Sequence, residues 1–149
     1  MARVHQAIAA KQKKFRVLDE VEQWKKQFIK DDSGMIVDVP SRFKMLVLLG
    51  PSRTGKTQFA KSIFGPDSTL VVECQRASEP CLHNYEWGKH AAIVFDEAQG
   101  SMVVGNKQLF QSPADEVRLG QSQCNQNSYL VLVYGVGMII CRTMLRYVF

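Results

Sequence analysis

The strongest constraint on the fold of this chain is an eight-residue stretch, Gly50–Thr57, which reads Gly-Pro-Ser-Arg-Thr-Gly-Lys-Thr. Its form, G-x-x-x-x-G-K-[ST], places glycines where the backbone must turn through dihedral angles that other residues resist. The N–H groups of such a curled loop point inward and make a concave site for an anion. In this pattern the lysine reaches the β- and γ-phosphates of a nucleotide, and the following hydroxyl binds Mg²⁺. The stretch therefore predicts a phosphate-binding loop.

The residues on both sides of the loop have the patterns that such a loop requires. Phe43 to Leu49 reads Phe-Lys-Met-Leu-Val-Leu-Leu, which predicts a buried strand, and Gln58 to Phe64 has the apolar spacing of a helix. The N-terminus of that helix adds its dipole to anion binding. We therefore expect the nucleotide to contact a continuous set of residues: Gly50, Pro51, Ser52, Arg53, Thr54, Gly55, Lys56, Thr57 and Gln58.

A second motif follows 40 residues after Lys56, where the apolar run Ala91–Phe95 ends in Asp96 and Glu97. An acid at the carboxyl end of a strand beside a phosphate-binding loop binds the Mg²⁺ that the loop hydroxyl also touches. Thr57 and Asp96 are therefore the expected metal ligands, and ATP with Mg²⁺ is the expected cofactor. Glu97 is placed to orient or deprotonate the water that attacks the γ-phosphate, so Lys56 and Glu97 are the expected catalytic residues. The alternative for this acidic pair is a solvated strand end.

Helix-like and strand-like segments alternate along the rest of the chain, which predicts an α/β domain with a mostly parallel sheet. A loop that contains Gly100 and Gly105 is expected to lead to a short helix at Lys107–Gln111. The further segments expected to be regular are strands at Thr69–Glu73, Val117–Leu119, Tyr129–Tyr134 and Met138–Cys141, and a helical turn at Leu82–Trp87.

The N-terminal part of the chain differs in pattern from the rest. Val4 to Ile29 has no glycine or proline, and it carries one apolar stripe that is expected to pack on the domain: Val17, Val21, Trp24 and Phe28. Residues 31–42 have the composition of a linker. We therefore divide the chain into an N-terminal helical segment with its linker, 1–42, and a core, 43–149.

Composition limits the classes of function. The chain has 46% hydrophobic and 22% charged residues, as in globular proteins. Its longest apolar run, Tyr129–Cys141, is interrupted by glycines and is shorter than the roughly 20 residues of a bilayer span, so no membrane role is expected. Four irregularly spaced cysteines without a secretory signal predict reduced thiols in a soluble intracellular protein, in nucleus or cytoplasm. Cys81 and His83 lack a second ligand pair at zinc spacing.

The two motifs also carry a family resemblance. Leu46–Phe64 resembles the Walker A region of superfamily 3 helicases, above all the helicase domain of Rep proteins from circular single-stranded DNA viruses and their integrated eukaryotic relatives. Ser52–Thr57 is its most specific part, and Ile93–Gln99 resembles the Walker B region of the same group. The resemblance covers about residues 43–141.

The resemblance implies a three-layer, AAA+-like P-loop NTPase core that assembles into a homo-oligomeric ring and pulls on one nucleic-acid strand with each ATP cycle. In that family, a hairpin between the Walker B motif and the sensor strand contacts the nucleic acid through basic residues. The corresponding stretch here is 107–127, and its basic residues are Lys107 and Arg118. Whether the strand is DNA or RNA is left open.

Three departures from the family leave other functions open. Arg142 and Thr143 stand where the family's sensor strand ends in asparagine, and the arginine finger normally lies beyond Phe149, with Arg146 a poor substitute. The histidines do not form the His-hydrophobe-His motif of a Rep nickase. A core truncated at its C-terminus is thus expected, and a truncated or decayed copy that binds nucleotide without unwinding is the main alternative. A small-molecule P-loop kinase is the second, although Arg76 is the only arginine between the two motifs that could serve in a lid.

Overall fold

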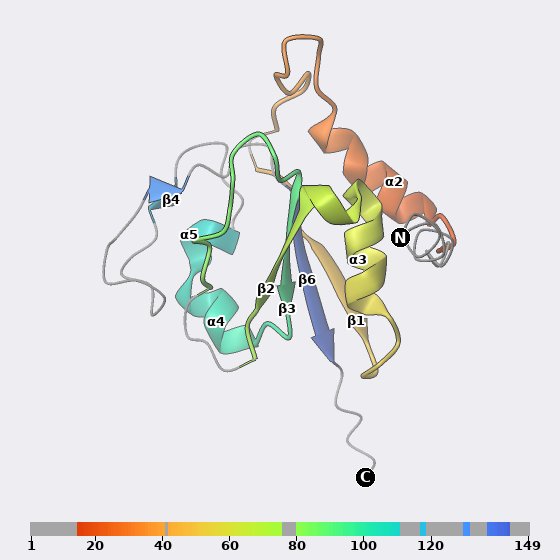
Figure 1. Cartoon of the computed structure of the whole chain (residues 1–149), viewed down its shortest axis with the longest axis vertical. Helices are drawn as coiled ribbons and strands as arrows, with labels where there is room; N and C mark the ends of the chain where they lie inside the picture. Colours follow the sequence, from red (N-terminus) through yellow and green to blue (C-terminus); the bar gives the residue numbers. More distant parts are fainter. Residues whose placement is uncertain are drawn as a thin grey trace, which may run out of the picture.

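A four-stranded parallel sheet forms the centre of the molecule in a computed structural model that describes residues 15–40, 42–75, 80–110, 117–118, 130–131 and 137–143. Its strands are β1 (Leu46–Gly50), β2 (Thr69–Glu73), β3 (Ala92–Asp96) and β6 (Gly137–Thr143). They lie in the order β1-β6-β3-β2, and each neighbouring pair is parallel (Figure 1). The predicted α/β class with a parallel sheet is confirmed.

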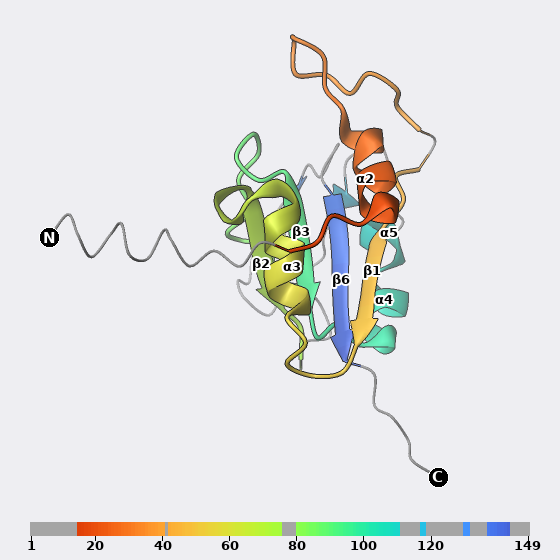
Figure 2. The same cartoon turned by 90° about the vertical axis from the view of Figure 1, so that its right-hand side faces the viewer.

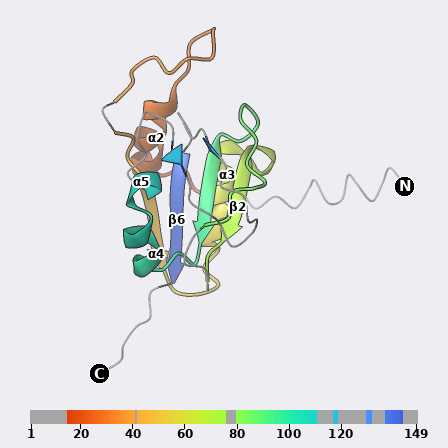
Figure 3. The same cartoon turned by 90° about the vertical axis from the view of Figure 1, so that its left-hand side faces the viewer.

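Helices cover both faces of this sheet. On one face lie α2 (Asp19–Lys25), which continues as the 3₁₀ helix η1 (Lys26–Phe28), and α3 (Lys56–Phe64) (Figure 2). On the other lie α4 (Gly100–Gly105) and α5 (Lys107–Phe110) (Figure 3). The 3₁₀ helix η2 (Pro66–Ser68) leads into β2, and a separate two-stranded antiparallel ladder joins β4 (Val117–Arg118) to β5 (Leu130–Val131).

Two clusters of buried side chains hold the layers together. The α3-side core consists of Trp24, Phe28, Ile36, Phe43, Ala60, Ala92, Val94, Ile139 and Cys141. The α4-side core consists of Val72, Cys74, Leu82, Ile93, Phe95, Ala98, Met102, Leu109, Phe110 and Ile140. The central strands β3 and β6 supply side chains to both clusters, because successive residues of a strand point to opposite faces.

The predicted buried strand at 43–49 is only partly correct. The strand begins at Leu46, and its residues Val47 and Leu49 are 48% and 56% exposed. The physical reason is position: β1 is the edge strand of the described sheet, so only its α3-side face is covered. By contrast β3, which reads as a continuous apolar run, is buried on both faces as predicted.

The N-terminal helix is shorter than the predicted 4–29. Among the described residues it begins at Asp19, and Leu18 before it has extended backbone. Trp24 and Phe28 join the α3-side core as expected, and the Trp24 indole N–H donates a 2.6 Å hydrogen bond to the carbonyl of Lys44. Val17 is 68% exposed rather than buried, because it precedes the helix and the helical spacing does not apply to it. Residues 1–14 lie outside the described part.

The other predicted elements agree with the structure to differing degrees. The strand Thr69–Glu73 is confirmed with its bounds, and the helix after the loop begins two residues earlier, at Lys56. The loop with Gly100 and Gly105 is instead helix α4, because burial of Met102 in the α4-side core outweighs the weak helix propensity of its terminal glycines. The predicted segments 107–111, 117–119 and 129–134 appear as α5, β4 and β5, and their remaining residues are outside the described part.

Around Leu82, where a helical turn was predicted, the amide of Tyr85 donates a 3.0 Å hydrogen bond to the Leu82 carbonyl, which closes a single turn. None of the helices in the described ranges is long and apolar enough to cross a bilayer.

Candidate active site

The stretch Gly50–Thr57 forms a tight loop between the carboxyl end of β1 and the first turn of α3. Two of its residues have left-handed backbone, Arg53 with φ of 61° and Gly55 with φ of 85°. Gly55 is the N-cap of α3, and a side chain there would be strained. Gly50 has no such backbone, and a Cβ there would make only ordinary contacts, 3.6 Å from Thr54 Oγ1. The predicted need for glycine dihedrals therefore holds for one of the two glycines.

The side chain of Lys56 folds back over the loop. Its Nζ donates hydrogen bonds to the carbonyls of Gly50, at 3.1 Å, and Pro51, at 2.7 Å. The hydroxyl of Thr54 donates to the same Pro51 carbonyl, at 2.9 Å. These bonds hold a positive charge against the loop at the N-terminus of a nine-residue helix, an arrangement that attracts an anion.

A hydrogen bond joins the loop to the second motif. The hydroxyl of Thr57 donates to Oδ2 of Asp96 at 3.1 Å, although the two residues are 39 positions apart in the sequence. The sheet register explains the meeting: β6 lies between β1 and β3, pairing Gly50 with Thr143 and Asp96 with Cys141. The two predicted metal ligands thus converge at the carboxyl edge of the parallel sheet, where ligands of open α/β sheets bind.

Glu97 follows Asp96 directly and also has left-handed backbone, with φ of 54°. The turn that contains it is tied to the end of β2, because the amide of Cys74 donates to the Asp96 carbonyl at 2.9 Å. The Gln99 side chain donates to the Gln75 carbonyl at 3.0 Å. Strained backbone of this kind persists only where the surroundings enforce it, and it is common at functional sites.

The charge of Asp96 acts on two buried thiols, Cys74 and Cys141, which sequence reasoning did not predict as neighbours of the site. Burial raises the pKa of Cys141 to about 12, with a further rise from Asp96 and an opposing effect of Lys56. Burial likewise raises the pKa of Cys74 to about 11, and the charges of Asp96 and Glu73 add to it. The charges of Asp96 and Lys56 therefore both act on Cys141, in opposite directions.

The oxygen atoms that meet here fit a magnesium ion. Mg²⁺ prefers oxygen ligands and is usually held by one or two carboxylates, with water and substrate phosphates completing its shell. Thr57 and Asp96 offer a hydroxyl and a carboxylate oxygen that already approach each other to 3.1 Å.

The cysteines differ from expectation in one respect. Cys74 and Cys141 are free and buried, as reduced thiols, whereas Cys81 is disulfide-bonded. The Cys81 sulfur also lies 2.7 Å from Nδ1 of His83. Within the described ranges, no group of three or more His, Cys, Asp or Glu side chains is arranged to hold a metal ion.

The residues expected to contact nucleic acid do not lie at the site formed by the phosphate-binding loop and Asp96. Lys107 is exposed at the start of α5, on the sheet face opposite α3. Only the backbone of Arg118 is described, in β4. The backbone of Arg142 and Thr143 pairs with Leu49 and Gly50, directly beside the loop. Arg76 and Arg146 lie outside the described residues.

Comparison with known proteins does not assign the chain to a family. No family model matches the sequence, and no curated protein matches it significantly.

Proposed function

We propose that this chain binds ATP with Mg²⁺ at the loop Gly50–Thr57 and hydrolyses it. The observation that carries the proposal is the 3.1 Å hydrogen bond between Thr57 and Asp96. Each motif was recognised from its own sequence pattern, and the fold brings both to one edge of the sheet. A chance match to either pattern would not be expected to produce this meeting.

The residues of the site have complementary roles in this reaction. The loop amides and the N-terminus of α3 bind the phosphates, and Lys56 neutralises charge on the β- and γ-phosphates. Thr57 and Asp96 hold the Mg²⁺, which supplies further charge neutralisation when bound. Glu97 accepts the proton of the attacking water.

We further propose that the domain is the AAA+-like motor core of a superfamily 3, Rep-like helicase, which acts on single-stranded DNA or RNA as a homo-oligomeric ring. The sequence resemblance of both motifs supports this assignment, and so does the parallel sheet with helices on its two faces. Lys107 and Arg118 are the proposed contacts to the strand, and Lys107 is exposed as this role requires.

The test is ATP turnover with and without single-stranded DNA or RNA. Lys56→Ala is expected to weaken ATP binding and abolish turnover, whereas Glu97→Gln is expected to retain binding and lower turnover about 100-fold or more. Lys61→Ala, which removes a lysine from the last turn of the same helix, is the matched control and is expected to behave as wild type. If wild type and Lys56→Ala share one background rate, the enzyme proposal fails.

A second candidate is a nucleotide-binding module that does not unwind nucleic acid. It is favoured by the end of β6, where Arg142 and Thr143 lie beside the loop in place of the family's asparagine. This candidate predicts ATP binding without strand displacement, and measurable strand separation would exclude it.

A further inference from the structure

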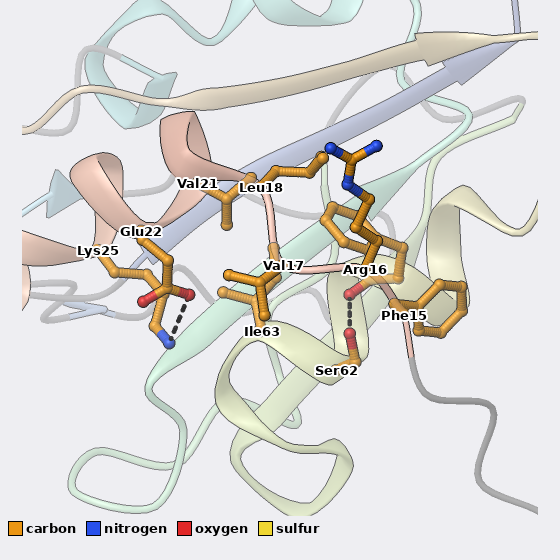
Figure 4. A pocket seen from close by; sticks show the side chains of 10 residues that line it. Phe15, Arg16, Val17, Leu18, Val21, Glu22, Lys25, Ser62 and Ile63 are labelled. Atoms are coloured by element: carbon orange, nitrogen blue, oxygen red, sulfur yellow. Dashed lines mark hydrogen bonds and ion pairs between the residues drawn. The ribbon is translucent and has the colours of Figure 1, made fainter.

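A pocket of about 340 Å³ lies between α3 on one side and α2 with the segment before it on the other (Figure 4). In Figure 4, Val17 and Ile63 face each other near its centre, with Glu22 and Lys25 on one side and Phe15 and Arg16 on the other. Its lining residues are Phe15, Arg16, Val17, Leu18, Val21, Glu22, Lys25, Phe59, Ser62 and Ile63. The volume is that of a small-molecule site.

One wall of this pocket reaches the phosphate-binding loop. The ring of Phe15 lies 3.9 Å from the position of a Cβ on Gly55, the residue that precedes Lys56. The same ring packs edge-to-face on Phe59, one turn into α3, with 5.6 Å between ring centroids. A molecule whose phosphates occupy the loop therefore has this pocket as its neighbour along α3.

The lining combines apolar side chains with three charged ones, Arg16, Glu22 and Lys25. Val17 and Leu18 are 68% and 40% exposed, although both are aliphatic. The hydroxyl of Ser62 is turned to the Phe59 carbonyl, to which it donates at 2.6 Å. Glu22 and Lys25 pair with each other at 3.4 Å. Two aromatic rings and open aliphatic side chains suit a flat, largely apolar group better than a second anion.

We propose that this pocket holds the base of the nucleotide whose phosphates bind the loop. The inference rests on the proposed function, and it names Phe15 and Phe59 as the aromatic contacts of the base. Base and phosphates are joined through the ribose, so one ligand spans both sites, and the base contact adds to affinity without taking part in hydrolysis.

The experiment compares two probes by calorimetry: ADP, which carries a base, and inorganic tripolyphosphate, which does not. Phe15→Ala is expected to weaken ADP binding about tenfold and to leave tripolyphosphate binding unchanged, since stacking on an aromatic side chain acts on the base alone. Lys56→Ala is expected to weaken both. Phe15→Tyr keeps an aromatic face and is expected to restore ADP affinity. Trp87→Ala removes an exposed aromatic side chain that does not line the pocket, and it is expected to change the binding of neither probe.

The outcomes separate this proposal from the function on which it rests. Equal affinities of wild type and Phe15→Ala for ADP, with Lys56→Ala still impaired, would overturn the base pocket and leave the nucleotide site intact. Equal losses for both probes in Phe15→Ala would also overturn it, because they would show that Phe15 only supports the loop. No binding of either probe by wild type would overturn the proposed function itself.

Discussion

At the scale of single residues, the site depends on backbone that is costly to hold. Arg53 and Glu97 have left-handed backbone without being glycine. Such a conformation costs about 1–3 kcal/mol per residue, which the surrounding structure must offset. For Glu97, the bond from the Cys74 amide to the Asp96 carbonyl and the Gln99 bond to Gln75 supply that support. A glycine would adopt the turn more easily, but it would remove the carboxylate proposed to act as base.

Tyr85 is a residue whose hydroxyl is expected to reduce stability. Its oxygen is buried and has no hydrogen-bond partner among the described residues, and burial raises its pKa to about 12. Tyr85→Phe is therefore expected to raise the free energy of unfolding by about 1 kcal/mol, because an unsatisfied polar group is removed from the interior. Urea denaturation measures the change.

The matched control removes a buried hydroxyl that is satisfied. Thr69 Oγ1 donates to the Gly65 carbonyl at 2.8 Å, so Thr69→Val is expected to lower the free energy of unfolding by about 1 kcal/mol. A loss of stability in Tyr85→Phe would show that its hydroxyl has a partner.

At the scale of elements, the N-terminal helix and the central strand meet at a glycine. A Cβ on Gly137, the first residue of β6, would lie 3.0 Å from Phe64 and 3.0 Å from Trp24. Both rings belong to a set of aromatic contacts, in which Trp24 also packs on Phe28 with 5.1 Å between centroids. The close packing of α2 on β6 therefore depends on the absence of a side chain at Gly137.

Gly137→Ala is expected to lower the free energy of unfolding by about 1–3 kcal/mol, because both rings must shift to admit the methyl group. Gly105→Ala is the control, since a Cβ at the end of α4 meets nothing within 4 Å. That substitution is expected to leave stability unchanged or to raise it slightly. Equal stability of Gly137→Ala and wild type in urea denaturation would show that the rings move at little cost.

At the scale of the whole molecule, each of the two cores contains one buried thiol whose pKa is raised from 9.0. Cys74 lies in the α4-side core with a pKa of about 11, and Cys141 in the α3-side core with a pKa of about 12. A raised folded-state pKa means that the folded protein keeps these protons longer than the unfolded chain does. Their contribution to stability is therefore complete below pH 9, decreases as the pH rises above 9, and is lost once the pH has passed the folded-state values.

The melting temperature of wild type is thus expected to fall between pH 9 and pH 10. The fall should be smaller in a Cys74→Ala, Cys141→Ala variant, even though this variant starts from a lower melting temperature because of the lost volume. The measurements stop at pH 10 so that ionisation of Tyr85, whose pKa is also raised by burial, contributes little to the change in melting temperature. Parallel melting curves of the two proteins over this range would contradict the assignment of the loss to the thiols.

The parts of the fold that follow from local patterns could be predicted from the sequence. Glycine dihedrals, continuous apolar runs and helical spacing depend on neighbouring residues, and they placed the loop, β2, β3 and α3 to within one or two residues. The same patterns predicted which residue types would serve the site: a lysine, a hydroxyl and an acid at a strand end. The sequence alone thus determined the proposed chemistry and the class of fold.

Tertiary structure decided what depends on residues distant in sequence. The strand order placed β6 between β1 and β3, which brought Thr57 and Asp96 together and left Val47 and Leu49 exposed at an edge. Burial of Met102 in the α4-side core made α4 a helix. Because α2 begins only at Asp19, Val17 lies before the helix and lines the pocket beside α3. These features could not be predicted because packing free energy, which depends on what covers each face, exceeds the small local preferences that a sequence displays.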